Sequence, residues 1–184
     1  MISCKHVLYF VVAAMLQSTV SFADQNNTSS SDSYGYALLY GVVSQNKNVD
    51  KLLWIKNPGK PVETWVNDIA SLSAKVNDQL ETWHEDGTIQ NLKDMGLPPT
   101  EVEARARATS RTRGDLLLSN GIDLRVDLIV AQLKALGYCA DLSYAMAKET
   151  SNSAIQKQLN SWQSEFTKLN AKGMSLLKTD IPQE

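Results

Sequence analysis

The 184-residue sequence predicts an all-α protein, an antiparallel bundle of four main helices preceded by short N-terminal helical segments. Three observations lead to this fold class. Apolar residues recur three and four positions apart over long windows, which is the spacing of a helix with one buried face. No stretch from Tyr34 onward alternates apolar and polar residues as a half-buried strand does. The longest windows would form helices of about 25 residues, with a length of about 38 Å.

The first 23 residues are expected to be a signal peptide. Lys5 precedes an uncharged run at 7–16, and Ser-Phe-Ala at 21–23 supplies the small residues that signal peptidase requires. A membrane anchor would need about 20 apolar residues, which this run does not reach. Cys4 lies before the run, so the usual lipoprotein attachment is not expected. We therefore expect export to a periplasm or out of the cell, with the exported chain beginning at Asp24 and having no stable membrane anchor.

Cleavage would leave 161 residues, which is enough for one domain with a substantial core. Loss of Lys5 changes the net charge from −2 to −3, and this weak acidic balance does not favour binding to nucleic acid or to an anionic membrane surface. Cys139 would be the one remaining cysteine, so hydrophobic packing must hold the fold without an internal disulfide. The polar residues 24–34 are expected to form a disordered leader, and residues 35–180 a single helical-bundle domain.

Turn and capping residues divide this domain into helices. Pro61 suits a first helical turn and Gly87 a helix end, and apolar residues between them follow at steps of three or four. Thr100 and Glu103 have the spacing of a capping box at the start of the next helix. At the end of the last helix, Gly173 favours fraying, whereas Met174, Leu176 and Leu177 favour continued apolar contact until Ile181-Pro182 ends the helix. The predicted helical segments are 37–44, 49–56, 61–86, 101–118, 122–148 and 153–177.

Residues 101–148 form either one long helix or two. Glycine inside a helix costs about 1 kcal/mol relative to alanine, and burial of an apolar face can offset this cost, but Ser-Asn-Gly at 119–121 favours a break. The second part, 122–148, carries two opposed apolar faces, so we expect neighbours on both sides of it. The first part carries four arginines between positions 105 and 113. They predict a solvated face, with contact to an anionic partner as the alternative.

Glu81 and His84 have the Glu-x-x-His spacing that supplies metal ligands in ferritin-like bundles. The number and length of the predicted helices fit either an up-and-down or a ferritin-like bundle. However, His84 is the only histidine after residue 23, and no second Glu-x-x-His follows on the long helices. The helical wheel also turns Glu81 toward solvent. We therefore predict no metal site and no cofactor, and keep Glu81 and His84 as weak candidates for metal ligands.

Arg125, Gln132 and Ser143 align at the edge of one apolar face of the 122–148 helix. They predict either hydrogen bonds that set the register between helices or a polar cleft that binds a small ligand. Cys139 lies close to them among apolar residues, where a thiol usually acts as a small buried side chain. The sequence contains no Gly-x-Ser-x-Gly, Cys-x-x-Cys or phosphate-binding glycine motif. We therefore predict no catalytic residues.

The four tryptophans separate predicted core from predicted surface. Trp65, Trp83 and Trp162 lie on apolar stripes and are predicted to be buried. Trp54 lies in a short apolar segment that cannot bury every side, so it predicts an exposed docking surface. We therefore expect a non-catalytic binding or assembly protein of the cell envelope, acting on a protein partner or as a homo-oligomer. The alternative is a ferritin-like metal-binding or redox bundle.

Overall fold

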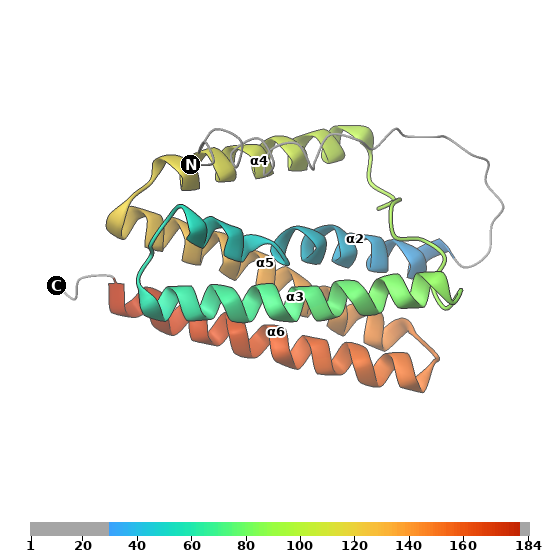
Figure 1. Ribbon diagram of the computed structural model, residues 1–184. Helices are drawn as coiled ribbons and strands as arrows, with labels where there is room; N and C mark the ends of the chain where they lie inside the picture. Colours follow the sequence, from blue (N-terminus) through green and yellow to red (C-terminus); the bar gives the residue numbers. More distant parts are fainter. Residues whose placement is uncertain (1–29, 181–184) are drawn as a thin grey trace, which may run out of the picture.

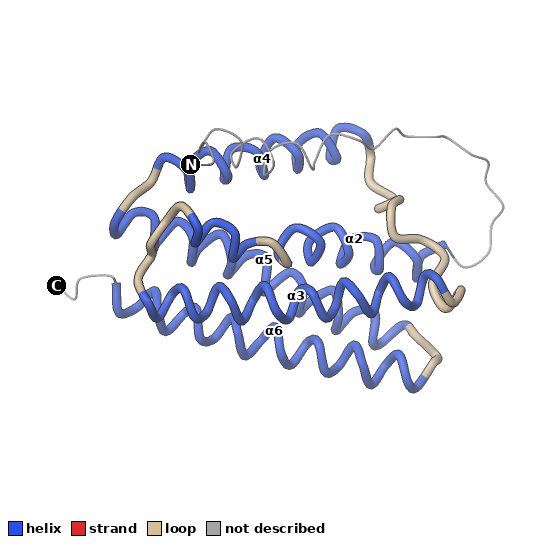
Figure 2. Tube along the Cα trace, in the orientation of Figure 1, coloured by secondary structure: helices blue, strands red, loops and turns tan. Residues whose placement is uncertain are grey.

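The computed structural model describes residues 30–180, with side chains placed at 34–179. These residues form an all-α helical bundle, and no β-strand occurs among them (Figures 1 and 2). The predicted signal peptide at 1–23 and the predicted leader up to residue 29 lie outside the described residues. The first described helix begins at Ser30, within the last part of the predicted leader at 24–34.

Successive α-helices of the described chain run in opposite directions (Figure 1). The predicted segment at 37–44 belongs to a longer helix, and the segment at 49–56 is a shorter 3-10 helix. The other four predicted helices are present within a few residues of their expected bounds. In chain order, the elements are α2 (Ser30–Asn46), η1 (Val49–Trp54), α3 (Lys60–Glu85), α4 (Pro99–Leu118), α5 (Gly121–Glu149) and α6 (Ser153–Asp180).

The hydrophobic core lies between α2, α3, α5 and α6. Helix α5 packs along α6 and against α2, while α3 packs against α2 and α6. Trp65 is fully buried, and its indole Nε1 donates a hydrogen bond of 2.8 Å to the Leu169 carbonyl oxygen on α6. Trp83 is partly buried, with its ring edge-on to Tyr36 and 5.2 Å from the ring of Trp162. The buried positions predicted for Trp65 and Trp162 are confirmed, whereas Trp83 lies at the edge of the core.

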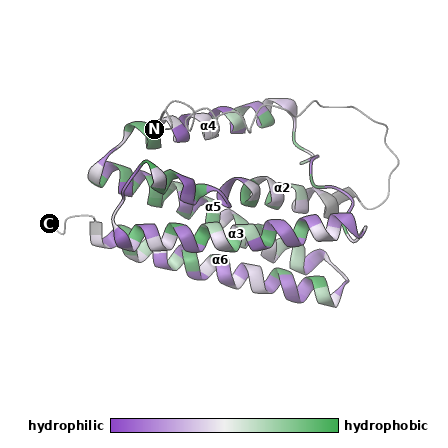
Figure 3. Cartoon of the chain, in the orientation of Figure 1, coloured by the Kyte–Doolittle hydropathy of each residue, from purple (hydrophilic) through white to green (hydrophobic). Residues whose placement is uncertain are grey.

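Helix α4 lies outside this core. Leu116 is the only buried side chain within Pro99–Leu118. This helix was predicted to be one of the four main helices of the bundle, and the N-terminal helical segments were predicted to be short additions to it. In the structure α2 supplies more of the core, because several of its side chains, including Leu39 and Val43, are fully buried. Figure 3 shows polar and apolar residues interspersed along α3 and α6, whose apolar sides face the core.

The predicted capping box at the start of α4 is not formed. The helix begins at Pro99 with Pro98 as its N-cap residue, so Thr100 lies within the first turn. Glu103 accepts a hydrogen bond of 2.8 Å from the Arg107 guanidinium one turn further on, and no side chain caps the helix. Pro99 lacks one of the amide hydrogens that a helix start leaves unpaired, and the Pro98 carbonyl oxygen accepts hydrogen bonds from the amides of Glu101 at 2.9 Å and Val102 at 3.1 Å.

The predicted break between the two halves of 101–148 is confirmed, since α4 ends at Leu118 and α5 begins at Gly121. Helix α5 buries side chains from both of its predicted faces, for example Ile129 on one and Leu128 on the other. Gly173 does not fray α6. It is buried within the helix, which continues to Asp180. Among the described helices, none combines the length and apolar character needed to cross a bilayer.

Candidate functional site

An exposed apolar patch lies at the end of the bundle where η1 and α4 finish. Eight large hydrophobic side chains are exposed in the part of the chain whose side chains are described, and five of them belong to this patch. Trp54 is 70% exposed and Leu118 is 82% exposed. We define the Trp54 patch as Trp54, Ile55, Leu117, Leu118 and Ile122. The exposure predicted for Trp54 is therefore confirmed, and the structure adds four residues that the sequence analysis did not select.

Lys56 holds the two segments of the patch together. Its ammonium Nζ donates hydrogen bonds to the Ser119 carbonyl oxygen at 2.8 Å and to Asn120 Oδ1 at 3.1 Å. Ser119 directly follows Leu118, and Lys56 directly follows Ile55, so these contacts place the turn after η1 against the turn between α4 and α5 (Figure 1). A cation beside the unpaired carbonyl groups at a helix C-terminus also stabilises that helix end.

The turn that carries Leu118 is further fixed by its own polar residues. Ser119 Oγ donates a hydrogen bond of 2.6 Å to Asp127 Oδ2 on α5, and Asn120 Nδ2 donates one of 3.2 Å to the Leu118 carbonyl oxygen. Gly121 has a φ of 59°, in the left-handed region that glycine enters without steric cost. Hydrogen bonds therefore hold the turn from which Leu118 projects.

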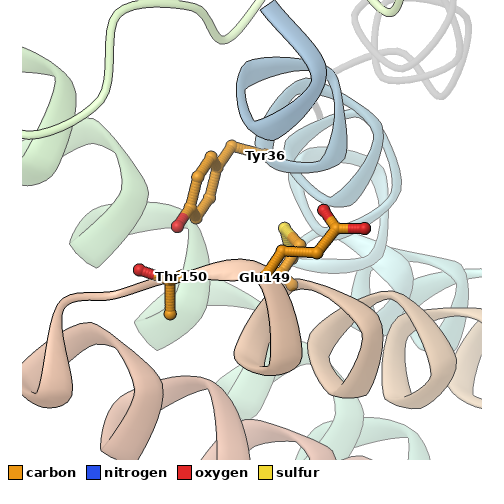
Figure 4. A pocket seen from close by; sticks show the side chains of 4 residues that line it. Tyr36, Glu149 and Thr150 are labelled. Atoms are coloured by element: carbon orange, nitrogen blue, oxygen red, sulfur yellow. The ribbon is translucent and has the colours of Figure 1, made fainter. Parts of the chain in front are cut away.

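Two cavities of the described structure are too small for most small-molecule ligands. One is beside the Trp54 patch, has a volume of about 180 Å³ and is lined by Leu53, Lys56, Asn57, Pro58 and Glu63. The other is about 10 Å³, at the opposite end of the bundle, where the Tyr36 hydroxyl points toward Thr150 and the Glu149 carboxylate lies to one side (Figure 4). Sites for drug-sized ligands usually measure about 300 Å³ or more. The apolar surface, rather than either cavity, is therefore the candidate site.

Glu81 and His84 each contact a different residue in the structure. The Glu81 carboxylate is partly buried and accepts a hydrogen bond of 2.9 Å from the Tyr40 hydroxyl, so it does not simply face solvent as the helical wheel predicted. Burial raises the pKa of Tyr40, and the contact with Glu81 raises it further. His84 is exposed, with Nδ1 at 3.2 Å from the Ile89 carbonyl oxygen. Within residues 34–179, no three His, Cys, Asp or Glu side chains are placed to hold a metal ion.

Arg125, Gln132 and Ser143 do not line either of the two cavities. Gln132 and Ser143 are buried, and Arg125 is partly buried. The Ser143 hydroxyl donates a hydrogen bond of 2.8 Å to the Cys139 carbonyl oxygen of its own helix, not to a neighbouring helix. The structure therefore gives no geometric support to a cleft around these residues, and small-ligand binding there stays a prediction.

Cys139 is buried among core residues as the sequence predicted. Burial raises the pKa of its thiol to about 12, because the charged thiolate would lose its hydration. The thiolate is the nucleophilic form of cysteine, so this side chain is protonated and unreactive at neutral pH. Cys139 therefore has a packing role in this fold.

Three of the four arginines of α4 are exposed, namely Arg105, Arg107 and Arg111, and Arg113 is partly buried. Arg105 and Arg107 each contact the glutamate four residues earlier, Glu101 and Glu103, at 2.8 Å. Arg105 also lies over the ring of Tyr138 on α5, 5.9 Å from its centre. Exposed ion pairs of this kind contribute little to stability, typically below about 1 kcal/mol. They do support a helix that buries only one side chain.

Sequence reasoning missed Lys56 and Leu118. A local signal for Leu118 was present, since α4 ends in three consecutive leucines and a helix cannot turn three consecutive side chains to the same face. Nothing near Lys56 in the sequence indicates that its ammonium group contacts residues more than 60 positions away.

No known protein family matches the chain, and comparisons with characterised proteins and with solved structures find no match either. The fold and the Trp54 patch are therefore interpreted from the chain's own residues.

Proposed function

We propose that this chain is an exported, non-catalytic binding protein that docks on a component of the cell envelope through the Trp54 patch. The main support for this proposal is that large apolar side chains are exposed at two turns at one end of the bundle. Exposed apolar side chains that gather at one end of a protein are typical of interaction sites. Among residues 34–179, no three His, Cys, Asp or Glu side chains are placed to hold a metal ion, and neither of the two cavities described above is lined by a histidine or a cysteine.

Docking through the Trp54 patch would gain free energy from the burial of its apolar side chains. Covering a large apolar side chain completely stabilises a complex by about 1.5–3 kcal/mol. Trp54 and Leu118 are the two most exposed large hydrophobic residues in the described chain. Because Lys56 already holds the two turns in contact, binding need not order them first, and less conformational entropy is lost.

Fractionation of the producing cells tests the proposal. We expect part of the wild-type protein to sediment with the envelope and the double variant Trp54→Ser/Leu118→Ser to stay in the soluble fraction. The matched control is Val102→Ser/Tyr144→Ser, which removes two exposed hydrophobic side chains outside the patch and should sediment like the wild type. Equal sedimentation of all three proteins would show that the patch is not the docking surface.

Export is tested on the same material. The intact mass of the exported protein should correspond to a chain that begins at Asp24, because Ser-Phe-Ala at 21–23 has the small residues required for cleavage. Retention of the full 184-residue mass in the cytoplasm would contradict export.

A further inference from the structure

Charged residues are unevenly distributed along the bundle. The half that carries the Trp54 patch, residues 43–72, 109–135 and 167–179, contains eleven Lys or Arg and six Asp or Glu. The opposite half, the remaining residues of 34–179, contains six Lys or Arg and ten Asp or Glu. The overall charge of −2 is small because the charges of a basic end and an acidic end nearly cancel. The net charge did not favour an anionic surface as a partner, whereas the basic end by itself does.

The exposed apolar residues gather in the basic half. Besides the Trp54 patch, Met174 near the end of α6 is exposed there, whereas Val102 and Tyr144 are the exposed large hydrophobics of the acidic half. Exposed Lys51 precedes Trp54 in η1, and exposed Arg111 lies two turns before Leu118 in α4. The same end thus offers apolar side chains and cations together.

We infer that the partner of the Trp54 patch is the surface of an anionic lipid bilayer, bound peripherally and reversibly; this inference rests on the docking role proposed above. Tryptophan and aliphatic side chains enter the interface between headgroups and acyl chains, while Lys and Arg are attracted to anionic headgroups. The acidic half would point away from the bilayer. This attraction acts over about 8 Å at physiological ionic strength, so it involves mainly the cations closest to the patch.

The position of the patch favours a bilayer over a protein partner. Trp54 and Leu118 are the last residues of their helices, so they project from turns at one end of an elongated bundle (Figure 1). Side chains on such turns can enter a fluid headgroup layer that needs no matching shape. A stable protein interface usually covers about 800 Å² on each partner and requires close shape complementarity.

Protein-free vesicles test this inference on the purified exported protein. We expect cosedimentation with vesicles of equal parts phosphatidylglycerol and phosphatidylcholine, weaker binding at raised salt, and little binding to pure phosphatidylcholine. Trp54→Ser/Leu118→Ser should bind at least about tenfold more weakly, since burial of one large apolar side chain contributes a factor of that order. Val102→Ser/Tyr144→Ser should bind like the wild type.

Tryptophan fluorescence reports the same event at Trp54, because Trp65 and Trp162 are already buried in the free protein. We expect the emission to shift to shorter wavelength on anionic vesicles. Trp54→Phe should keep most of the binding and lose most of the shift, which assigns the signal to this side chain. Circular dichroism of each variant confirms that the helices are retained.

Four outcomes would overturn the inference. Equal binding to neutral and anionic vesicles would remove the role of the basic end. Absence of vesicle binding, while envelope sedimentation still depends on the patch, would leave the docking role standing and exclude lipid as its partner. Light scattering that shows a dimer lost in Trp54→Ser/Leu118→Ser would assign the patch to a second copy of the chain. Failure of both sedimentation and vesicle binding would reject the docking role as well.

Discussion

Substitution of Gly173 by alanine is expected to destabilise the protein, although alanine is the better helix former. Gly173 lies inside α6, where replacement of glycine by alanine would ordinarily stabilise by about 1 kcal/mol. A Cβ atom there would overlap the indole ring of Trp65 and approach Leu133 Cδ2 to 3.0 Å. Trp65 is fully buried, and its Nε1 is bonded to the Leu169 carbonyl oxygen, so the ring cannot move aside without losing that bond.

The magnitude follows from these competing effects. Overpacking a dense core costs about 1–3 kcal/mol, and a buried donor left without its acceptor costs about 1–3 kcal/mol more. Subtracting the helix preference of alanine, about 1 kcal/mol, gives an expected net loss of about 1–5 kcal/mol in the free energy of unfolding. Gly137→Ala on α5 is the matched control, because its Cβ would lie 3.7 Å from Asn170 Nδ2, an ordinary contact. It should stabilise by about 0.5–1 kcal/mol.

Urea unfolding followed by tryptophan fluorescence measures both changes, since Trp65 and Trp162 are buried in the core. A double-mutant cycle with Trp65→Phe isolates the contact. In that background Gly173→Ala should cost at least about 1 kcal/mol less than in the wild type, because the overlapping part of the ring is gone. An unchanged or higher stability of the single variant Gly173→Ala would refute the close packing of α6 against Trp65.

The remaining predictions concern buried polar groups and the α4 end. The free energy of unfolding should fall as pH rises from about 9 to about 12, because the Cys139 thiol has a pKa of about 12 in the folded protein and about 9 in the unfolded chain. Urea titrations at several pH values measure this decline, which Cys139→Ala should flatten. An equal decline in Cys139→Ala would contradict the prediction. The buried Ser73 hydroxyl lacks a hydrogen-bond partner among the described residues. Ser73→Ala should therefore leave the free energy of unfolding unchanged or raise it by up to about 1 kcal/mol in the same assay. A clear loss of stability would contradict this prediction. Lys56→Met should weaken the C-terminal end of α4 by about 1 kcal/mol, measured as faster amide hydrogen exchange at 116–118, and unchanged exchange there would argue against the Lys56 contact.

Most of the fold could be predicted because helix formation leaves a local pattern. The apolar residues of α3 and α6 recur at helical spacing, and Gly121 together with its polar neighbours indicates the break before α5. Errors and open alternatives arose where a local signal had a competing explanation. Gly173 is a helix breaker by preference, yet in the structure it provides space for the ring of Trp65. Thr100 resembles a cap, but Pro99 begins the helix before it.

The candidate site was predictable only in part. Exposure of Trp54 followed from the shortness of its apolar segment, which cannot bury residues on every side. The rest of the patch depends on Lys56 meeting the turn after α4, and a contact across more than 60 positions leaves no trace in the residues around it. Likewise, the Glu81 carboxylate was expected to face solvent because the helical wheel of α3 contains no information about Tyr40 on α2.

By itself the sequence determined the all-α class, the positions of the long helices, the burial of Trp65 and Trp162 and the exposure of Trp54, because each depends on spacing and composition within one segment. Only the tertiary structure decided that α2 joins the core while α4 lies outside it, that the exposed apolar residues share one end, and that basic and acidic residues separate along the bundle. These properties depend on which distant segments lie side by side, and that choice is made by the packing of whole helices rather than by any local pattern.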